Sequence, residues 1–367
     1  MKNFNRKHLS RRGSIALLAG AVAANSLPGP LQAQTLTKVR YGFANKSVSS
    51  DVLNLVIGQQ LGYYREEGLD ADFVPLGSTA AVLAEVAAGR IDIALGVPSF
   101  QIPLVVSGQQ LPAINYFEHT YPFKYGISVT PRSSITALGQ LKGKRIGVSS
   151  FGTTDYPVGK VILTIAGLDT EKDVTWLAVG EGITAGQALV RGDIDALMYY
   201  DTGFGQIEAA GIALRSLPLP PNLPKVGGIY LSASPETLKK RANVAVGFAR
   251  AVAKAETFIM TNPAAAVYNF IQMFPQAAPQ GVSLAEQIRT IEIPLARRSR
   301  LYRCYDPAVH QLGYILPSEW VAEIRFVGAQ SKVPNPNDFF TNDFAREINR
   351  FNVEAIRKQA SEFKVPG

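Results

Sequence analysis

Two short stretches, Gly89-Arg90-Ile91-Asp92 and Gly192-Asp193-Ile194-Asp195, decide the fold, because they are one element repeated about 100 residues further along the chain. In each copy a glycine ends a helical stretch and an Ile-Asp pair opens an apolar, strand-like run. Two further pairs recur at nearly the same offset: Gly68-Leu69-Asp70 with Gly167-Leu168-Asp169, and Leu76-Gly77 with Val179-Gly180. The order predicts two similar α/β lobes of about 100 residues each. The alternative is that α/β units resemble one another in general.

Around the first copy, strand-like and helical patterns alternate, which is typical of α/β units with parallel strands. Ser49, Ser50 or Asp51 can cap the first helix, which Gly62 ends. The predicted elements are strand Val39–Phe43, helix Val52–Leu61, strand Ala71–Leu76, helix Ala80–Ala88 and strand Ile91–Leu95.

Two more apolar runs, Tyr125–Val129 and Val226–Leu231, are predicted as hinge strands that carry the chain into the second lobe and back. Residues 34–124 then form lobe 1, residues 125–232 form lobe 2, and residues 233–367 form a helical C-terminal part that returns to lobe 1. The helices expected in that part are Pro235–Thr261, Ser318–Val327 and Asp343–Ser361.

The formal net charge of +8 is concentrated at the N-terminus, where residues 1–33 carry five basic side chains and no acid. The apolar run Ile15–Ala24 follows, and at about 15 Å as a helix it is too short to cross a bilayer. This pattern predicts a signal peptide over residues 1–33, cleaved after Ala33 or, alternatively, after Ser26. Ser10-Arg11-Arg12 adds a twin-arginine character. The alternative is an amphipathic N-terminal helix of a cytosolic protein.

The sequence therefore predicts an exported, periplasmic protein whose mature chain is only mildly basic, with no nucleic-acid partner. The single cysteine, Cys304, cannot form an internal disulfide, and with three histidines in the chain it makes a metal site improbable. Loops resembling a nucleophile elbow (residues 147–152) and a phosphate loop (residues 152–161) have the wrong spacing. No catalytic set, metal or cofactor is predicted. The arginine-rich run 297–303 is expected to be a solvated helix face, with a docking surface as the alternative.

Polar, glycine-rich loops follow the carboxyl ends of the predicted strands, where ligands bind in open α/β sheets. Four acids in these loops, Glu118, Asp155, Glu181 and Asp201, favour a ligand with N–H donors over nitrate or a sulfonate. The alternative is that these acids lie on the rim of the binding site. The predicted ligand-binding residues are Asn45, Ser47, Ser78, Thr79, Ser99, Phe100, Glu118, His119, Ser149, Thr153, Thr154, Asp155, Glu181, Tyr200 and Asp201.

Several motifs resemble the nitrate/sulfonate/taurine class of ABC-transporter substrate-binding proteins, within the superfamily of thiamine-pyrimidine-synthase-like domains. They are Leu61-Gly62-Tyr63-Tyr64-Arg65-Glu66-Glu67-Gly68-Leu69, Leu141-Lys142-Gly143-Lys144-Arg145-Ile146-Gly147-Val148, and the two Gly-x-Ile-Asp strands. The resemblance covers roughly residues 38–235.

The resemblance implies a bilobed α/β fold of the type II periplasmic-binding-protein kind, and a monomer that is not an enzyme. Such a protein captures a small organic molecule or anion between its lobes and delivers it to an ABC permease. One alternative is an exported enzyme of the pyrimidine-synthase-like superfamily, with His119 and Asp155 or Asp201 as its acid/base pair. The cysteine-rich motif of those enzymes is absent, since Cys304 is the only cysteine. Another alternative is a ligand-sensing receptor.

Overall fold

The computed structural model of the chain describes residues 35–333 and 335–366. The predicted signal peptide lies outside the described residues. No helix in the described part of the chain has the length and apolar character needed to span a membrane.

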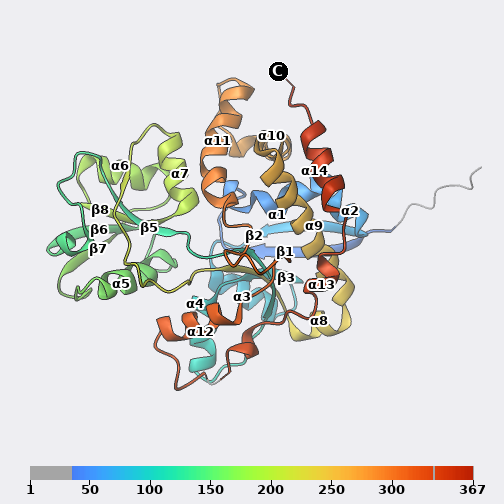
Figure 1. Ribbon diagram of the computed structural model, residues 1–367, viewed down its shortest axis with the longest axis horizontal. Coiled ribbons are helices and arrows are strands. Elements are labelled where there is room, and N and C mark those ends of the chain that lie inside the picture. The colour runs from blue at the N-terminus through green and yellow to red at the C-terminus, as the bar shows by residue number, and fades with distance from the viewer. Residues whose placement is uncertain (1–34, 334, 367) are drawn as a thin grey trace, which may run out of the picture. The chain divides into compact units, whose positions relative to one another are not determined.

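Two five-stranded sheets organise residues 36–366 (Figure 1). The first has the order β2-β1-β3-β10-β4, and β10 runs antiparallel to both of its neighbours. Its strands are β1 (Thr37–Phe43), β2 (Leu69–Pro75), β3 (Ile93–Gly96), β4 (Ile114–Thr120) and β10 (Ile229–Ala233). The second sheet has the order β7-β6-β8-β5-β9. Its strands are β5 (Tyr125–Val129), β6 (Lys144–Val148), β7 (Val174–Ala178), β8 (Ala196–Tyr200) and β9 (Arg215–Ser216).

The predicted repeat has a structural cause. In each sheet three parallel strands are followed by one antiparallel strand, so β2-β1-β3-β10 corresponds to β7-β6-β8-β5. The repeated aspartates make the same contact: Asp92 Oδ2 accepts from the backbone N–H of Arg40 at 2.8 Å, and Asp195 Oδ2 from that of Arg145 at 2.8 Å. In each lobe the aspartate thus links the start of its third parallel strand to its first strand, β3 to β1 and β8 to β6. The two-lobed α/β fold is confirmed.

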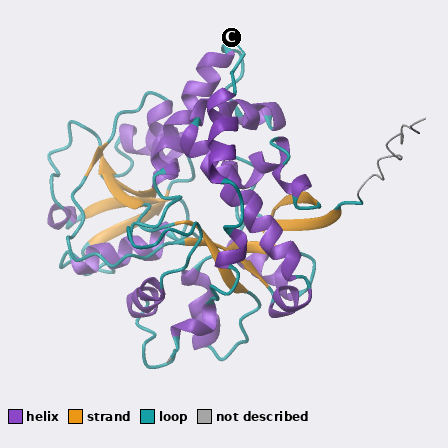
Figure 2. Ribbon diagram, turned by 45° about the vertical axis from the view of Figure 1, so that its right-hand side comes forward, coloured by secondary structure: helices purple, strands orange, loops and turns teal. Residues whose placement is uncertain are grey.

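Helices pack against the faces of both sheets (Figure 2). Lobe 1 contains η1 (Ser50–Val52), α1 (Leu53–Gln60), α2 (Tyr63–Glu66), α3 (Thr79–Ala87) and α4 (Pro98–Val106). Lobe 2 contains η2 (Leu138–Leu141), α5 (Asp155–Ile165), α6 (Ile183–Arg191) and α7 (Asp201–Ala209). The C-terminal part contains α8 (Pro235–Lys240), α9 (Ala242–Thr261), α10 (Pro263–Met273), η3 (Pro275–Ala277), α11 (Leu284–Ser299), α12 (Pro317–Phe326), η4 (Pro336–Phe339), α13 (Ala345–Ile348) and α14 (Val353–Glu362).

The C-terminal helices complete lobe 1, because α9, α10 and α11 share one buried apolar cluster with β1 and α1. The helix expected over Pro235–Thr261 is two helices, since Arg241 has a non-helical backbone (φ −129°, ψ 38°) between α8 and α9. The helix expected over Asp343–Ser361 is likewise divided into α13 and α14.

Two segments of chain cross between the sheets. Residues 121–124 connect β4 to β5, and residues 217–228 connect β9 to β10. The sequence places residues 226–231 in a hinge strand and ends lobe 2 at residue 232, but β10 is an interior strand of the first sheet. The residues of β10 do not by themselves show which sheet the strand joins, because an apolar strand of this length fits either one.

Candidate ligand-binding site

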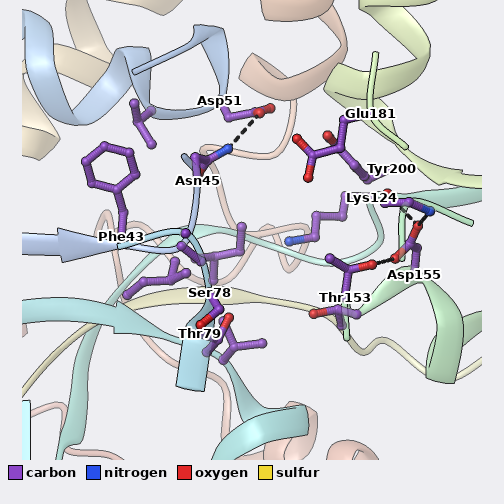
Figure 3. A pocket seen from close by; sticks show the side chains of 18 of the residues that line it. Phe43, Asn45, Asp51, Ser78, Thr79, Lys124, Thr153, Asp155, Glu181 and Tyr200 are labelled. Carbon is purple, nitrogen blue, oxygen red and sulfur yellow. Dashed lines mark hydrogen bonds between the residues drawn. The ribbon is translucent and has the colours of Figure 1, made fainter. Parts of the chain in front are cut away.

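A cavity of about 310 Å³ lies between the two lobes, and we call it the cleft (Figure 3). Its walls come from the loops that follow β1, β2 and β3 in lobe 1 and β6, β7 and β8 in lobe 2. Such loops are where open α/β sheets bind ligands, because the parallel strands end there and helix N-termini begin. Phe43, Leu95, Val97 and Ile229 add apolar surface.

Ten of the fifteen predicted residues line the cleft: Asn45, Ser78, Thr79, His119, Ser149, Thr153, Thr154, Asp155, Glu181 and Tyr200. Five do not belong to its lining: Ser47, Ser99, Phe100, Glu118 and Asp201. Contact of the first group with a ligand stays a prediction.

Asp155 lines the cleft, but neighbouring groups already satisfy its carboxylate. Oδ2 accepts from the backbone N–H and the hydroxyl of Ser149 at 2.6 and 2.7 Å, and Oδ1 accepts from Thr153 Oγ1 at 2.5 Å. The residue opens α5, where the helix dipole also favours a negative charge. Asp155 therefore shapes the loop after β6.

Asp201, the first residue of α7, is neutralised by Arg298 of α11. Arg298 Nε and Nη2 donate to the two carboxylate oxygens at 2.9 and 2.7 Å, and both side chains are at most 4% exposed. Burial alone would raise the pKa of Asp201, but the guanidinium charge and its hydrogen bonds hold that pKa below the ordinary value. The solvated helix face expected for the arginine run is thus wrong for Arg298, because this partner in the other lobe stabilises it in the interior.

The other two acids behave differently. Glu118 is buried beside Tyr230 and Glu319, and burial followed by the nearby carboxyl raises its pKa well above the usual value. Glu181 is exposed at the cleft, and desolvation raises its pKa less strongly. Asp51, which the prediction omitted, also lines the cleft and accepts from Asn45 Nδ2 at 3.3 Å. Three of the four predicted acids therefore offer no free carboxylate to the cleft, and the argument against an anionic ligand now rests on Glu181 and Asp51 alone.

Lys124 is a cleft residue that the sequence reasoning missed. It lies in the first crossover, and Figure 3 shows its side chain extending into the space between the residues of the two lobes. Burial, and then the charge of Arg298, lower the pKa of Lys124 to about 7. No ion pair or hydrogen bond to its ammonium is formed by the residues that the structure describes. Its position directly before the predicted hinge strand Tyr125–Val129 was the available signal.

His119 lies in the cleft wall as a neutral side chain. It is 2% exposed, and burial lowers its pKa to about 3. The amide of Asn54 donates to Nδ1 at 3.3 Å and to Glu256 Oε1 at 2.9 Å, so Nδ1 is the acceptor and Nε2 carries the proton. Within the described residues Nε2 has no hydrogen-bond partner. His119 can therefore donate one hydrogen bond, and it is a poor general base at neutral pH.

A second set of buried carboxyls supports the crossover 217–228. Glu323 Oε1 accepts from the backbone N–H of Gly227 at 2.5 Å, and burial raises the pKa of Glu323 to about 8. Burial likewise raises the pKa of Glu319 to about 7. No group of three or more His, Cys, Asp or Glu side chains in the described ranges is arranged to hold a metal.

These raised pKa values give a prediction for stability. In the folded protein the Glu323 carboxyl keeps its proton up to about pH 8, whereas in the unfolded chain it loses the proton near pH 4.5. The contribution of this group to the free energy of unfolding is therefore complete below pH 4.5 and is lost as the pH rises through about 8. Glu323→Gln should flatten the decline in unfolding free energy between pH 4.5 and 8 by up to about 1.4 kcal/mol per pH unit. Urea unfolding across this range measures it. Glu354→Gln, on exposed α14, is the control, and equal slopes in wild type and Glu323→Gln would contradict the assignment.

Comparison with known proteins gives one family and a consistent fold. Residues 49–266 match the family model described as NMT1/THI5 like. The putative binding protein YtlA of Bacillus subtilis (strain 168) is 24% identical over 254 residues, which is 69% of this chain and 73% of that protein. A 4-amino-5-hydroxymethyl-2-methylpyrimidine phosphate synthase of Aspergillus parasiticus is 25% identical over 248 residues, which is 60% of this chain and 66% of that enzyme.

Among solved structures, the alkanesulfonate-binding protein SsuA from Xanthomonas axonopodis pv. citri, bound to MOPS, has a TM-score of 0.58 at 17% identity. The match covers 85% of this chain and 97% of that chain. The predicted bilobed periplasmic-binding-protein fold is confirmed by this likeness.

Proposed function

Because the chain belongs to the NMT1/THI5-like family, we propose that it is the solute-binding component of an ABC importer, which captures a small organic anion in the cleft. The putative binding protein YtlA and the sulfonate-binding SsuA are related in sequence and in fold, respectively, which supports this function. Capture between two lobes needs a pocket and two bodies, and it needs no catalytic group.

The observation that carries the proposal is the ammonium of Lys124 inside the cleft, which lies 5.2 Å from the centre of the Tyr125 ring and forms no ion pair with a carboxylate of the described residues. A partly buried cation that is not paired with a carboxylate is stabilised when a ligand brings a negative charge. Ser78 and Thr79 at the start of α3 and the loop before α5 can donate further hydrogen bonds to an acidic group.

The size of the cleft limits which classes of ligand can fill it. A volume of about 310 Å³ falls within the range of organic-ligand pockets. Nitrate, with four atoms, would leave most of this volume to water. An organic acid, with its head at Lys124 and its body against Phe43, Leu95 and Val97, fits the lining better.

We further propose that the protein works in the periplasm as a monomer and delivers its ligand to a permease in the cytoplasmic membrane. The basic and apolar N-terminal sequence supports export, with twin-arginine and general secretion both open.

A thermal-shift screen tests the function. We expect an organic sulfonate or carboxylate to raise Tm by several degrees, because ligand at 100 times its Kd adds about 2.7 kcal/mol of stability. Nitrate should have little effect. The panel includes alkanesulfonates, taurine, aromatic acids, flavins and aminopyrimidines, and the absence of a shift with any of them would contradict the proposal.

The pyrimidine synthase among the relatives keeps an enzyme as a second candidate. The acid/base pairs expected for it are not supported, since Asp155 and Asp201 have other partners and His119 has a pKa of about 3. Mass spectrometry of the bound ligand before and after long incubation distinguishes the two functions, because a binding protein returns it unchanged. Turnover that disappears in His119→Ala would favour the enzyme.

A further inference from the structure

Apart from the two crossovers and Phe326 of α12, which packs on the apolar core of lobe 2, the lobes meet where α7 of lobe 2 packs on α11 of lobe 1. Each helix is anchored in its own lobe. Ile288, Ile291 and Leu295 of α11 belong to the apolar core of lobe 1, and Phe204 and Ile207 of α7 belong to a core cluster of lobe 2. We call this contact the α7–α11 pillar.

The two helices approach so closely that the contact requires a glycine. A Cβ atom on Gly205 of α7 would lie 2.4 Å from the Cα of Pro294 in α11, which is far inside van der Waals contact. Any larger side chain at position 205 must therefore push the two helices, and with them the two lobes, apart.

Charged groups join the lobes on both sides of this crossing. The buried bidentate pair Arg298–Asp201 lies at the end nearest the cleft, where Arg298 contributes to the lining. Arg297 donates to Glu208 at 2.8 and 2.5 Å at a partly exposed position. A hydrogen bond from Thr202 to Asp51 adds a third link.

Open space flanks the pillar. The cleft lies on the Arg298 side, and a groove of about 610 Å³ lies between η3 and α11 of lobe 1 and α6 and α7 of lobe 2. The groove is lined mainly by alanine, proline and aliphatic side chains, including Ile183, Ala209 and Val282. The pillar is therefore a close interlobe contact with open space on two of its sides.

We propose that the α7–α11 pillar is a permanent pivot that stays closed without ligand, so that the lobes open only at the opposite rim of the cleft. Separation at the pillar would leave Arg298 and Asp201 as unpaired charges on surfaces shaped to bury them. At the opposite rim, Ser78 of lobe 1 faces Thr153 of lobe 2 with no bond between them among the described residues (Figure 3). This inference concerns how the lobes move and does not depend on which ligand binds.

Two spin-label pairs in a Cys304→Ser background test it by double electron–electron resonance on the ligand-free protein. Ala210→Cys with Arg289→Cys reports on the pillar, and Ala80→Cys with Pro157→Cys reports on the opposite rim; all four positions are exposed. We expect one narrow distance distribution for the pillar pair and a broader distribution for the rim pair. A pillar distribution as broad as that of the rim overturns the proposal.

Variants supply the matched comparison. Asp201→Asn and Gly205→Leu should broaden or lengthen the pillar distance, whereas Asp195→Asn should not, because the bidentate Arg145–Asp195 pair lies wholly within lobe 2. A pillar distance unchanged in folded Asp201→Asn and Gly205→Leu also overturns the proposal. If either variant fails to fold, Gly205→Ala replaces it, and the wild-type distributions decide the question by themselves.

Discussion

Arg298→Met should lower the free energy of unfolding by about 3–5 kcal/mol, which is among the largest effects that a single side chain can have. The substitution leaves the Asp201 carboxylate, 1% exposed, buried without its counter-ion. Urea unfolding followed by circular dichroism measures the change.

Two controls separate the buried ion pair from simple loss of contact. In Arg298→Met/Asp201→Leu no charge is left unpaired, so most of the lost stability should return. Arg145→Met breaks an Arg–Asp pair of similar geometry whose side chains are 45% and 29% exposed, and it should cost about 1 kcal/mol or less. Arg298→Met within 1 kcal/mol of wild type would show that the pair does not hold the lobes together.

Lys124→Met should weaken binding of the organic anion found in the screen by about 100-fold, since a charge-assisted contact in a partly buried site is lost. Wild-type affinity should also fall about tenfold for each pH unit above 7. The pKa of about 7, which burial and Arg298 impose on Lys124, means that the charged form predominates below pH 7 and is lost as the pH rises through this value. Isothermal titration from pH 6 to 9 measures both effects.

Lys142→Met is the matched control, because Lys142 is exposed and pairs with Asp173 within lobe 2. It should leave both the affinity and its pH dependence unchanged. An affinity that is independent of pH in wild type, or that survives in Lys124→Met, would mean that the anionic head binds elsewhere.

The repeated motifs could be interpreted from the sequence because each lies within one α/β lobe and recurs in the other. Asp92 and Asp195 each bond to the strand two strands earlier in the chain, 52 and 50 residues away, so one short pattern marks the same arrangement in both sheets. Loop positions at strand ends also follow from this pattern, which explains why most of the predicted residues line the cleft. The hydroxyls that satisfy Asp155 are within six residues of it and were open to the same reasoning.

What could not be predicted depends on contacts between distant parts of the chain. Arg298 lies 97 residues after Asp201, and nothing in the run of arginines distinguishes the one that enters the interior from those that stay in solvent. Lys124 is a cleft residue only because residues 121–124 cross between the sheets. The long C-terminal helix is divided at Arg241, where the sequence has no proline or glycine that would predict a break.

The most direct test of the central claim, that the cleft holds the solute, is isothermal titration of the screened anion against Asn45→Trp. Asn45 lies in the cleft wall, so an indole there should fill the cavity and abolish binding while Tm stays near the wild-type value. Gln59→Trp, at an exposed position at the end of α1, should bind as wild type does. Wild-type affinity in folded Asn45→Trp would contradict the account, because the solute would then occupy another site.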